Sequence, residues 1–158
     1  MAEKTNAARI LDRLKIKYEL VEYQVDPENL AADHVAEELG EPIEQVYKTL
    51  VLRGDKNGVF VCVVAGNREV DLKKAAKAAG EKSVSMLKSK ELLPLTGYIH
   101  GGCSPIGMKK FFPTFIDCQV EGLETFFFSG GKVGAQVEMA PEDLKKVIVY
   151  KIADVTAE

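Results

Sequence analysis

The sequence predicts an α+β fold with a mixed, mostly antiparallel sheet, curled or closed into a β-barrel, and surrounded by helices. Its short β-branched and aromatic runs cluster as hairpins and do not alternate strictly with helices, which disfavours a doubly wound parallel sheet. With 158 residues, 46% of them apolar and 28% charged, the chain can bury one core of ordinary size. No linker or repeat divides it, so we predict one domain over residues 1–158.

Capping residues and apolar spacing predict the helices. Thr5 can cap a first helix that has Ile10, Leu11 and Leu14 on one face. Further helical segments, bounded by a capping residue, glycine or proline, are expected over residues 30–39, 42–45, 72–79, 89–93 and 141–146. The segment that begins at residue 89 is expected to end before Pro94, because proline cannot donate the backbone hydrogen bond of a helix.

β-Branched and aromatic runs between turn residues predict the strands. Residues 46–53 and 59–65 are expected to pair as a hairpin, because Gly54 and Gly58 bound the short loop between them. The remaining strands are expected at residues 18–23, 114–118, 125–129, 135–139 and 147–150.

Charge and cysteine content exclude several classes of function. The net charge of −3 argues against wrapping of duplex DNA, although a local pocket for one nucleotide or phosphate remains allowed. The first ten residues contain no apolar stretch of the secretory type, and the longest apolar run, residues 59–65, is far shorter than the roughly 20 residues that cross a bilayer. The sparse cysteines lack a Cys-x-x-Cys pair, so we predict a cytoplasmic protein with free thiols, no metal site and no membrane partner.

Lys48 is the most informative single position. Strand alternation places it on the same face as Leu50 and Leu52. A lysine on a mostly apolar strand must be paired, reach solvent at the strand end, or point into a wet pocket. In a pocket its ammonium would bind a carbonyl, carboxylate or phosphate group, and the pattern alone leaves these alternatives open.

Two glycine-rich stretches, residues 100–107 and 129–134, are the next candidates. The paired Gly101 and Gly102 allow a ligand to approach the backbone and meet its N–H groups, and Lys132 in the second stretch could meet a phosphate. Tight loops that merely need glycine explain both stretches equally well. Neither has the spacing of a dinucleotide or triphosphate motif.

Cys103 and His100 raise the alternative of a thiol nucleophile with a histidine base. Such a site needs contact between the two side chains and an environment that lowers the thiol pKa. A spacing of three residues does not establish contact, and the sequence offers no third orienting group. This cysteine-hydrolase alternative predicts that Cys103→Ala abolishes activity.

Taken together, four ordered segments resemble the YbaK/EbsC family of free-standing Cys-tRNA(Pro) deacylases, which are related to the editing domain of bacterial prolyl-tRNA synthetases. These segments are VYKTL at 46–50, DLKK at 71–74, GYIHGGCSPIG at 97–107 and SGGK at 129–132. The resemblance extends over about residues 5 to 155. It implies a mixed β-barrel core surrounded by helices.

The resemblance also implies a reaction, the removal of cysteine from mischarged Cys-tRNA(Pro) and also from Cys-tRNA(Cys). Cysteine and proline are similar in size, so a synthetase cannot separate them by fit alone, and a second sieve is needed. In this family the substrate thiol attacks its own ester, which yields a thiolactone and free tRNA without a cofactor. The expected partners are the 3′ end of an aminoacyl-tRNA and prolyl-tRNA synthetase. Two alternatives stay open: editing of another small amino acid such as alanine by water, and a non-catalytic module that binds a tRNA end or nucleotide.

Matching positions imply the site residues. Lys48 is expected at the terminal ribose or ester, and the Gly101 backbone at the aminoacyl carbonyl or amine. The substrate-binding residues implied by the resemblance are Tyr23, Tyr47, Thr49, Gly102, Ser129 and Gln136.

Gln136 departs from the family pattern. Where related sequences often continue SGGK with Arg-Gly-Leu-Asp, this chain has Val133, Gly134, Ala135 and Gln136. The glutamine can accept a hydrogen bond through its carbonyl oxygen, but it lacks the charge of an aspartate. The departure concerns amino-acid specificity rather than the fold.

Overall fold

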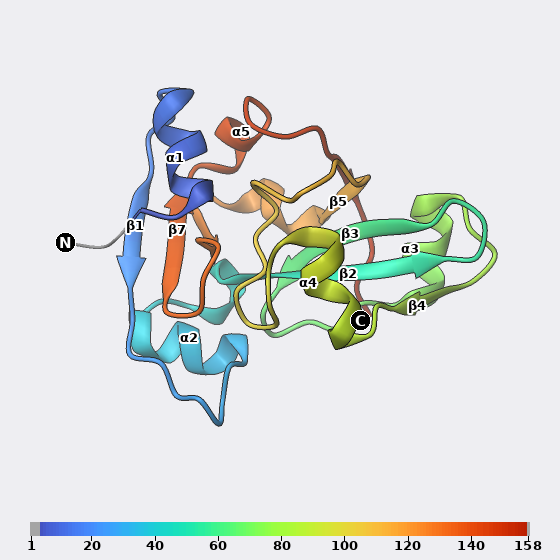
Figure 1. Ribbon diagram of the computed structural model, residues 1–158, viewed down its shortest axis with the longest axis horizontal. Coiled ribbons are helices and arrows are strands. Elements are labelled where there is room, and N and C mark those ends of the chain that lie inside the picture. Colours follow the sequence, from blue (N-terminus) through green and yellow to red (C-terminus); the bar gives the residue numbers. More distant parts are fainter. Residues whose placement is uncertain (1–3, 158) are drawn as a thin grey trace.

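The computed structural model describes residues 4–157, whose strands form two sheets (Figure 1). The three-stranded sheet has the order β1 (Glu19–Glu22), β7 (Ala135–Met139), β6 (Phe126–Ser129) and is antiparallel throughout. The five-stranded sheet has the order β4 (Val84–Met86), β2 (Tyr47–Gly54), β3 (Val59–Ala65), β5 (Thr114–Asp117), β8 (Lys151–Ala153). Its β3–β5 and β5–β8 pairs are parallel and its other pairs antiparallel. The predicted α+β class with mixed, mostly antiparallel pairing is confirmed.

Of the two predicted forms, a curled sheet or a closed β-barrel, the closed barrel is not formed by the two sheets of the described chain. Within residues 4–157, one parallel bridge between Val46 and Phe127 joins the sheets. The outer strands β4 and β8 have three residues each, and such short edge strands offer little backbone for further pairing.

The predicted hairpin is present and forms the centre of the larger sheet. Tyr47 pairs with Ala65 at one end and Arg53 with Val59 at the other. The buried carboxylate of Glu81 accepts hydrogen bonds from the backbone N–H groups of Lys56 and Asn57 at 2.9 and 2.8 Å, which holds the connecting loop. Because β2 lies between β3 and β4, both of its edges are paired. Its two faces pack into different core clusters, with Tyr47 and Val51 in one and Leu52 in the other, which agrees with its mostly apolar sequence.

Helices surround the sheets, and local capping explains where they begin and end. Thr5 accepts the Ala8 N–H at 3.1 Å at the start of α1, and Asp71 accepts the Lys73 and Lys74 N–H groups at the start of α3. The helices are α1 (Asn6–Arg13), α2 (Ala32–Leu39), η1 (Ile43–Gln45), α3 (Leu72–Ala79), α4 (Ser89–Thr96), η2 (Cys118–Gly122) and α5 (Pro141–Leu144). No helix within residues 4–157 has the length and apolarity needed to span a bilayer.

Two predicted boundaries are wrong. Helix α4 continues past Pro94, and the Gly97 N–H still bonds the Leu93 carbonyl at 2.9 Å. Pro94 is the sixth of the eight residues of this helix, so its ring removes one backbone donor near the helix end while the last turn still closes. Residues 147–150 form no strand; the Val147 N–H turns back to the Leu144 carbonyl, and β8 begins at residue 151. Strand β4, with its three residues, was not predicted.

The main core fills the space between the two sheets. It contains residues of β2 and β3 (Tyr47, Val51, Val61, Val63), of β6 and β7 (Phe126, Phe128, Val137), and Leu11 of α1. A second cluster packs α3 against the opposite face of the larger sheet, and a third packs α2 against Val46 and Phe127. Helix α2 is therefore fixed beside the start of β2, where the sheets are bridged.

Candidate active site

A cavity of about 750 Å³ opens where the start of β2 meets the segment before α2 and the glycine-rich segment after α4. Most of the predicted site residues line it, namely Tyr47, Lys48, Thr49, Gly101, Ser129 and Gln136. Lys48 and Gly101, which the sequence places 53 positions apart (101 − 48), thus share one cavity. Tyr23 and Gly102 are not among its lining residues.

The ammonium of Lys48 lies at the cavity wall with 25% of the side chain exposed. It donates to the Gly66 carbonyl at 3.4 Å and lies 3.7 Å from the Glu69 carboxylate. Glu69 is 86% exposed, and an ion pair with such an exposed partner contributes little free energy. The ammonium can therefore turn to an incoming polar group at small cost.

Three shielded polar atoms of the cavity residues have no hydrogen-bond partner within the described chain: the Tyr47 hydroxyl, Thr49 Oγ1 and Gln136 Oε1. Burial raises the pKa of Tyr47, and the nearby Asp117 charge acts in the same direction, so its phenol stays neutral. Buried polar atoms without partners are costly and uncommon, and these three belong to residues that line the cavity.

Gly101 is the glycine of the pair that faces the cavity. Its φ of +85° is in the left-handed region, and a Cβ there would lie 3.1 Å from Leu30 Cδ1. Within residues 4–157 its N–H has no hydrogen-bond partner, so this amide can donate to a ligand. The next N–H, of Gly102, is already bonded to the Ile99 carbonyl at 3.0 Å.

Gly102 has a packing role in place of the predicted cavity position. It is buried, and a Cβ there would lie 3.1 Å from the Val133 backbone nitrogen and 3.2 Å from the Lys132 Cα. The loop between β6 and β7 thus rests directly on the glycine turn. Ser129 at the start of that loop lines the cavity, while its Oγ accepts the Gly131 N–H at 3.1 Å.

Tyr23 lies away from the cavity lining. It follows β1, its N–H donates to the Gly134 carbonyl at 3.0 Å, and its ring packs against the third core cluster beside α2. In this structure it supports the wall that α2 forms.

Cys103 lines the cavity as a buried thiol, 8% exposed. Burial raises its pKa to about 12, so the thiol is protonated at neutral pH. No hydrogen bond joins it to the exposed His100 within the described chain. Both requirements of the cysteine-hydrolase alternative, a base in contact and a lowered thiol pKa, are unmet.

Sequence reasoning missed an acidic rim on the cavity. Glu28, Asp33 and Glu69 line it together with Lys48, the one Lys or Arg among the described lining residues. These carboxylates come from loops or a helix terminus, where no periodic pattern marks a site. They favour a cationic group such as an amino acid's ammonium.

One cluster outside this cavity could hold a cation by proximity, since Asp117, Cys118 and Asp154 offer ligand atoms within 4.8 Å of one another. The Lys74 ammonium contacts both Asp154 carboxylate oxygens at 3.1 and 3.2 Å, whereas Asp117 Oδ2 is buried without a partner in the described chain. Asp117 Oδ1 accepts the Val155 N–H at 2.9 Å. This cluster holds the C-terminal segment against the sheet.

Comparison with known proteins places these features in a family. The model of the aminoacyl-tRNA editing domain matches residues 26–147, most of the chain. The chain belongs to the aminoacyl-tRNA editing domain family. That match includes the whole segment from the acidic rim through Lys48 and Gly101 to Gln136.

Individual relatives agree with this membership. EbsC of Enterococcus faecalis, named as a candidate Cys-tRNA(Pro)/Cys-tRNA(Cys) deacylase, is 44% identical over 99% of this chain and 95% of its own length. A proline–tRNA ligase of Fervidobacterium nodosum is 30% identical over 66% of this chain but 18% of the ligase. The solved structure of a candidate trans-editing enzyme for prolyl-tRNA synthetase superposes with a TM-score of 0.84 at 25% identity, covering 99% of this chain and 100% of that one. The resemblance inferred from the sequence motifs is confirmed.

Proposed function

We propose that this protein is an aminoacyl-tRNA deacylase that edits in trans and removes cysteine from Cys-tRNA(Pro) and from Cys-tRNA(Cys). The observation that carries the proposal is the convergence of the Lys48 ammonium and the unbonded Gly101 amide on one cavity. The name of its E. faecalis relative supports the choice of cysteine. Prolyl-tRNA synthetase is the proposed partner, since related segments occur within proline–tRNA ligases.

The chemistry follows from what each group can donate. The sulfur of the substrate cysteine attacks the ester carbonyl carbon, so that a C–S bond forms and the C–O bond to the ribose breaks. The thiol proton ends on the ribose oxygen, and the products are a cyclic thiolactone and free tRNA. The Gly101 N–H would stabilise the carbonyl oxygen as it gains charge, and Lys48 the departing ribose oxygen.

The remaining cavity residues would orient the substrate. Tyr47 and Thr49 offer neutral hydroxyls, while Gln136 offers an amide oxygen that accepts from an ammonium group. The acidic rim of Glu28, Asp33 and Glu69 supplies the negative charge that Gln136 lacks. Binding of the substrate ammonium therefore does not require an aspartate at position 136.

A deacylation panel tests the proposal. Purified protein is incubated with Cys-tRNA(Pro), Cys-tRNA(Cys), Ser-tRNA and Ala-tRNA, and release of the amino acid is followed. Thiol attack predicts fast release of cysteine and slow release of serine, which has nearly the same shape but a far weaker nucleophile. Absence of cysteine release at enzyme excess refutes the proposal.

Two other outcomes identify the alternatives. Faster release of alanine than of cysteine would indicate attack by water, because alanine has no thiol. Tight binding of uncharged tRNA without turnover of any substrate would indicate a non-catalytic module.

A further inference from the structure

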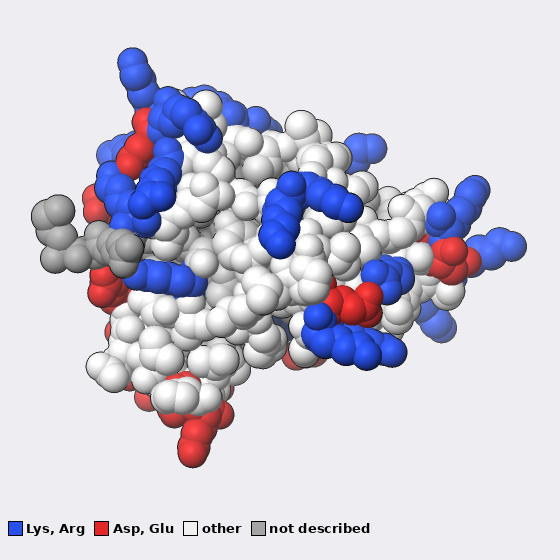
Figure 2. All heavy atoms as spheres, in the orientation of Figure 1, with Lys and Arg blue, Asp and Glu red and all other residues white. Residues whose placement is uncertain are grey.

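Acidic side chains are concentrated in one part of the surface, although the net charge is only −3. Every Asp, Glu, Lys or Arg within residues 26–45 is acidic. Figure 2 shows acidic side chains at the end of the molecule where α2 lies, and Lys and Arg side chains over α1 and near the middle of the same face. A polyanion would therefore be repelled from the end of the molecule where α2 lies.

An exposed basic and aromatic segment, Lys109–Lys110–Phe111, lies on the basic side. Both lysines are exposed, and Phe111 is 68% exposed. The next residue, Phe112, packs against the main core and anchors the segment. Exposed aromatic rings beside cations are typical of surfaces that bind single-stranded nucleic acid, where bases stack on the ring and phosphates pair with the charges.

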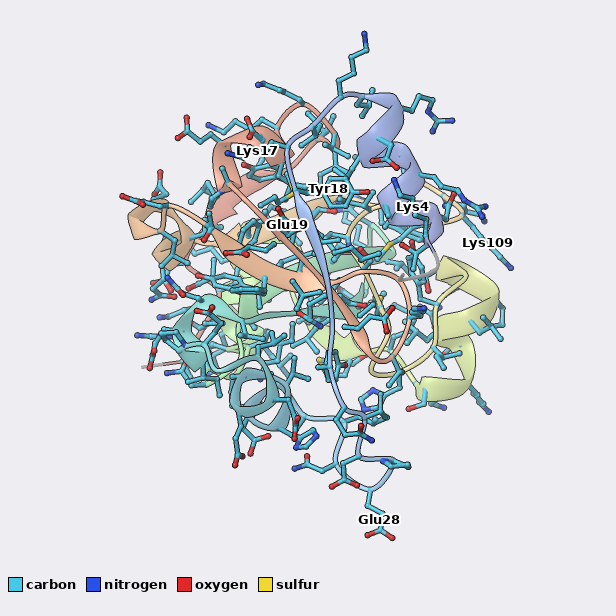
Figure 3. All side chains as sticks on the ribbon, turned by 90° about the vertical axis from the view of Figure 1, so that its left-hand side faces the viewer. Lys4, Lys17, Tyr18, Glu19, Glu28 and Lys109 are labelled. Atoms are coloured by element: carbon cyan, nitrogen blue, oxygen red, sulfur yellow. The ribbon has the colours of Figure 1, made fainter. Side chains whose placement is uncertain are left out.

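This segment is attached close to the cavity wall. The Lys109 N–H donates to the Thr96 carbonyl at 3.0 Å, and the Lys109 Cγ lies 3.3 Å from the position of a Cβ on Gly97. Leu92 and His100, on either side of this contact in the chain, both line the cavity. Figure 3 shows Lys109 extending outward between α1 and α4.

The acidic rim restricts the direction from which an RNA strand can approach the cavity. Phosphates would be repelled from the side of the cavity that carries Glu28, Asp33 and Glu69. From Leu92 to Gly97, the residue that follows α4, the helical rise is about 7.5 Å, or about two nucleotides at the 3.4 Å spacing of a stacked strand. A strand whose last nucleotide occupies the cavity can therefore reach Lys109 within a few nucleotides.

We propose that Lys109, Lys110 and Phe111 bind the single-stranded RNA that precedes the terminal adenosine of the substrate. The two ammonium groups contact phosphates and the Phe111 ring stacks on a base. This inference rests on the proposed function, since it assigns the path of the RNA whose end enters the cavity.

Binding of uncharged RNA tests the surface without any need for turnover. The affinity of a fluorescently labelled uncharged tRNA is measured by anisotropy at several salt concentrations, for the wild type, Lys109→Ala/Lys110→Ala and Phe111→Ala. We expect Phe111→Ala to weaken binding about five-fold or more. The double lysine variant should lower the slope of log K against log salt by about 1.4, or 0.7 for each lost phosphate contact.

Matched controls exist near the C-terminus, where Lys145, Lys146 and Val149 are exposed. Lys145→Ala/Lys146→Ala and Val149→Ala should leave RNA affinity unchanged, and Lys109→Arg/Lys110→Arg should retain it. Unchanged affinity in the Lys109/Lys110 and Phe111 variants, or an equal loss in the controls, overturns the inference. A loss of synthetase binding with intact RNA binding also overturns it, because the surface would then bind protein.

The proposed deacylase function and the proposed RNA path can each be refuted without refuting the other. If the deacylation panel shows cysteine release while the Phe111 and lysine variants bind RNA normally, the proposed function stands and the RNA path is wrong. If RNA binding depends on these residues but no aminoacyl-tRNA is deacylated, the surface is right and the enzymatic proposal is wrong.

Discussion

At the scale of single residues, Lys48 combines a backbone in a buried strand with an ammonium group that extends to the cavity. Its backbone belongs to a strand whose neighbours are buried in two cores, yet its ammonium extends to the cavity wall near Gly66 and Glu69. The apolar part of the side chain can lie along the strand while the charge stays in a wet cavity. We therefore expect Lys48 to serve the cavity rather than the stability of the fold.

Lys48→Ala should lower kcat/KM for Cys-tRNA(Pro) by about 100- to 1,000-fold, the usual effect of removing one preorganised donor from a developing charge. The free energy of unfolding should change by less than about 1 kcal/mol, because the contact to Glu69 is an exposed ion pair. Deacylation kinetics and urea denaturation measure the two effects. Wild-type kcat/KM in Lys48→Ala, with Lys145→Ala as the control for general charge loss, would contradict the assigned role.

Cys103→Ala should retain deacylation to within a few-fold. The buried thiol is protonated at neutral pH because its pKa is raised to about 12, and in the proposed mechanism the attacking sulfur belongs to the substrate. A protein nucleophile would instead lose about 10⁴-fold or more on truncation. Single-turnover rates of the purified variant distinguish these results, and a loss of that size would restore the cysteine-hydrolase alternative.

At the scale of elements, the glycine turn after α4 and the loop between β6 and β7 form one unit. Gly101 supplies an amide at the cavity, while Gly102 allows the backbone of Lys132 and Val133 to approach. The two neighbouring glycines thus have different roles: Gly101 presents an amide to the cavity, and Gly102 allows close packing of the facing loop. Displacement of either segment should move the other.

Gly102→Ala should destabilise the protein by about 1–3 kcal/mol, as overpacking of a close backbone contact does, and lower kcat/KM through the shift of Gly101. The added Cβ would lie 3.1–3.2 Å from backbone atoms of the facing loop. Gly122→Ala is the control, because nothing lies within 4 Å of its Cβ position, and it should change stability by less than about 0.5 kcal/mol. Equal stabilities of the two variants in urea denaturation would contradict the packing role.

At the scale of the whole molecule, buried titratable groups make the fold sensitive to alkali. Burial raises the pKa of Cys62, Cys103 and Tyr98 to about 12. In the unfolded chain the thiols ionise near their ordinary pKa of 9.0. Between about pH 9 and 12 the unfolded state therefore holds fewer protons than the native state, and the free energy of unfolding falls as pH rises.

Urea denaturation at pH 7.5 and at pH 10.5 should reveal this loss, up to about 1.4 kcal/mol per pH unit for each buried thiol. Replacement of both buried cysteines, in Cys62→Ala/Cys103→Ala, should flatten the dependence even though it lowers stability at neutral pH. An identical alkaline slope in this variant would show that the thiols do not cause the effect.

The sequence by itself determined the local structure of this protein. The Thr5 cap, the helix over residues 72–79, and the hairpin of β2 and β3 follow from interactions within a few residues, and all are present. The run at 147–150 has equally strong β propensity but is no strand, while residues 151–153 pair with β5. Propensity is a local property, whereas a strand exists only where a partner edge is within reach.

Only the tertiary structure decided the composition of the cavity. Motif resemblance pointed to Lys48, Gly101 and Gln136, but the separate positions of Tyr23 and Gly102, and the acidic rim, depend on how α2 and the glycine loops pack against the bridged sheets. These segments are distant in the chain and carry no shared periodicity. Hydrophobic periodicity predicts which face of a helix or strand is buried. The lining of a cavity depends instead on which loops are brought together when the helices and sheets pack.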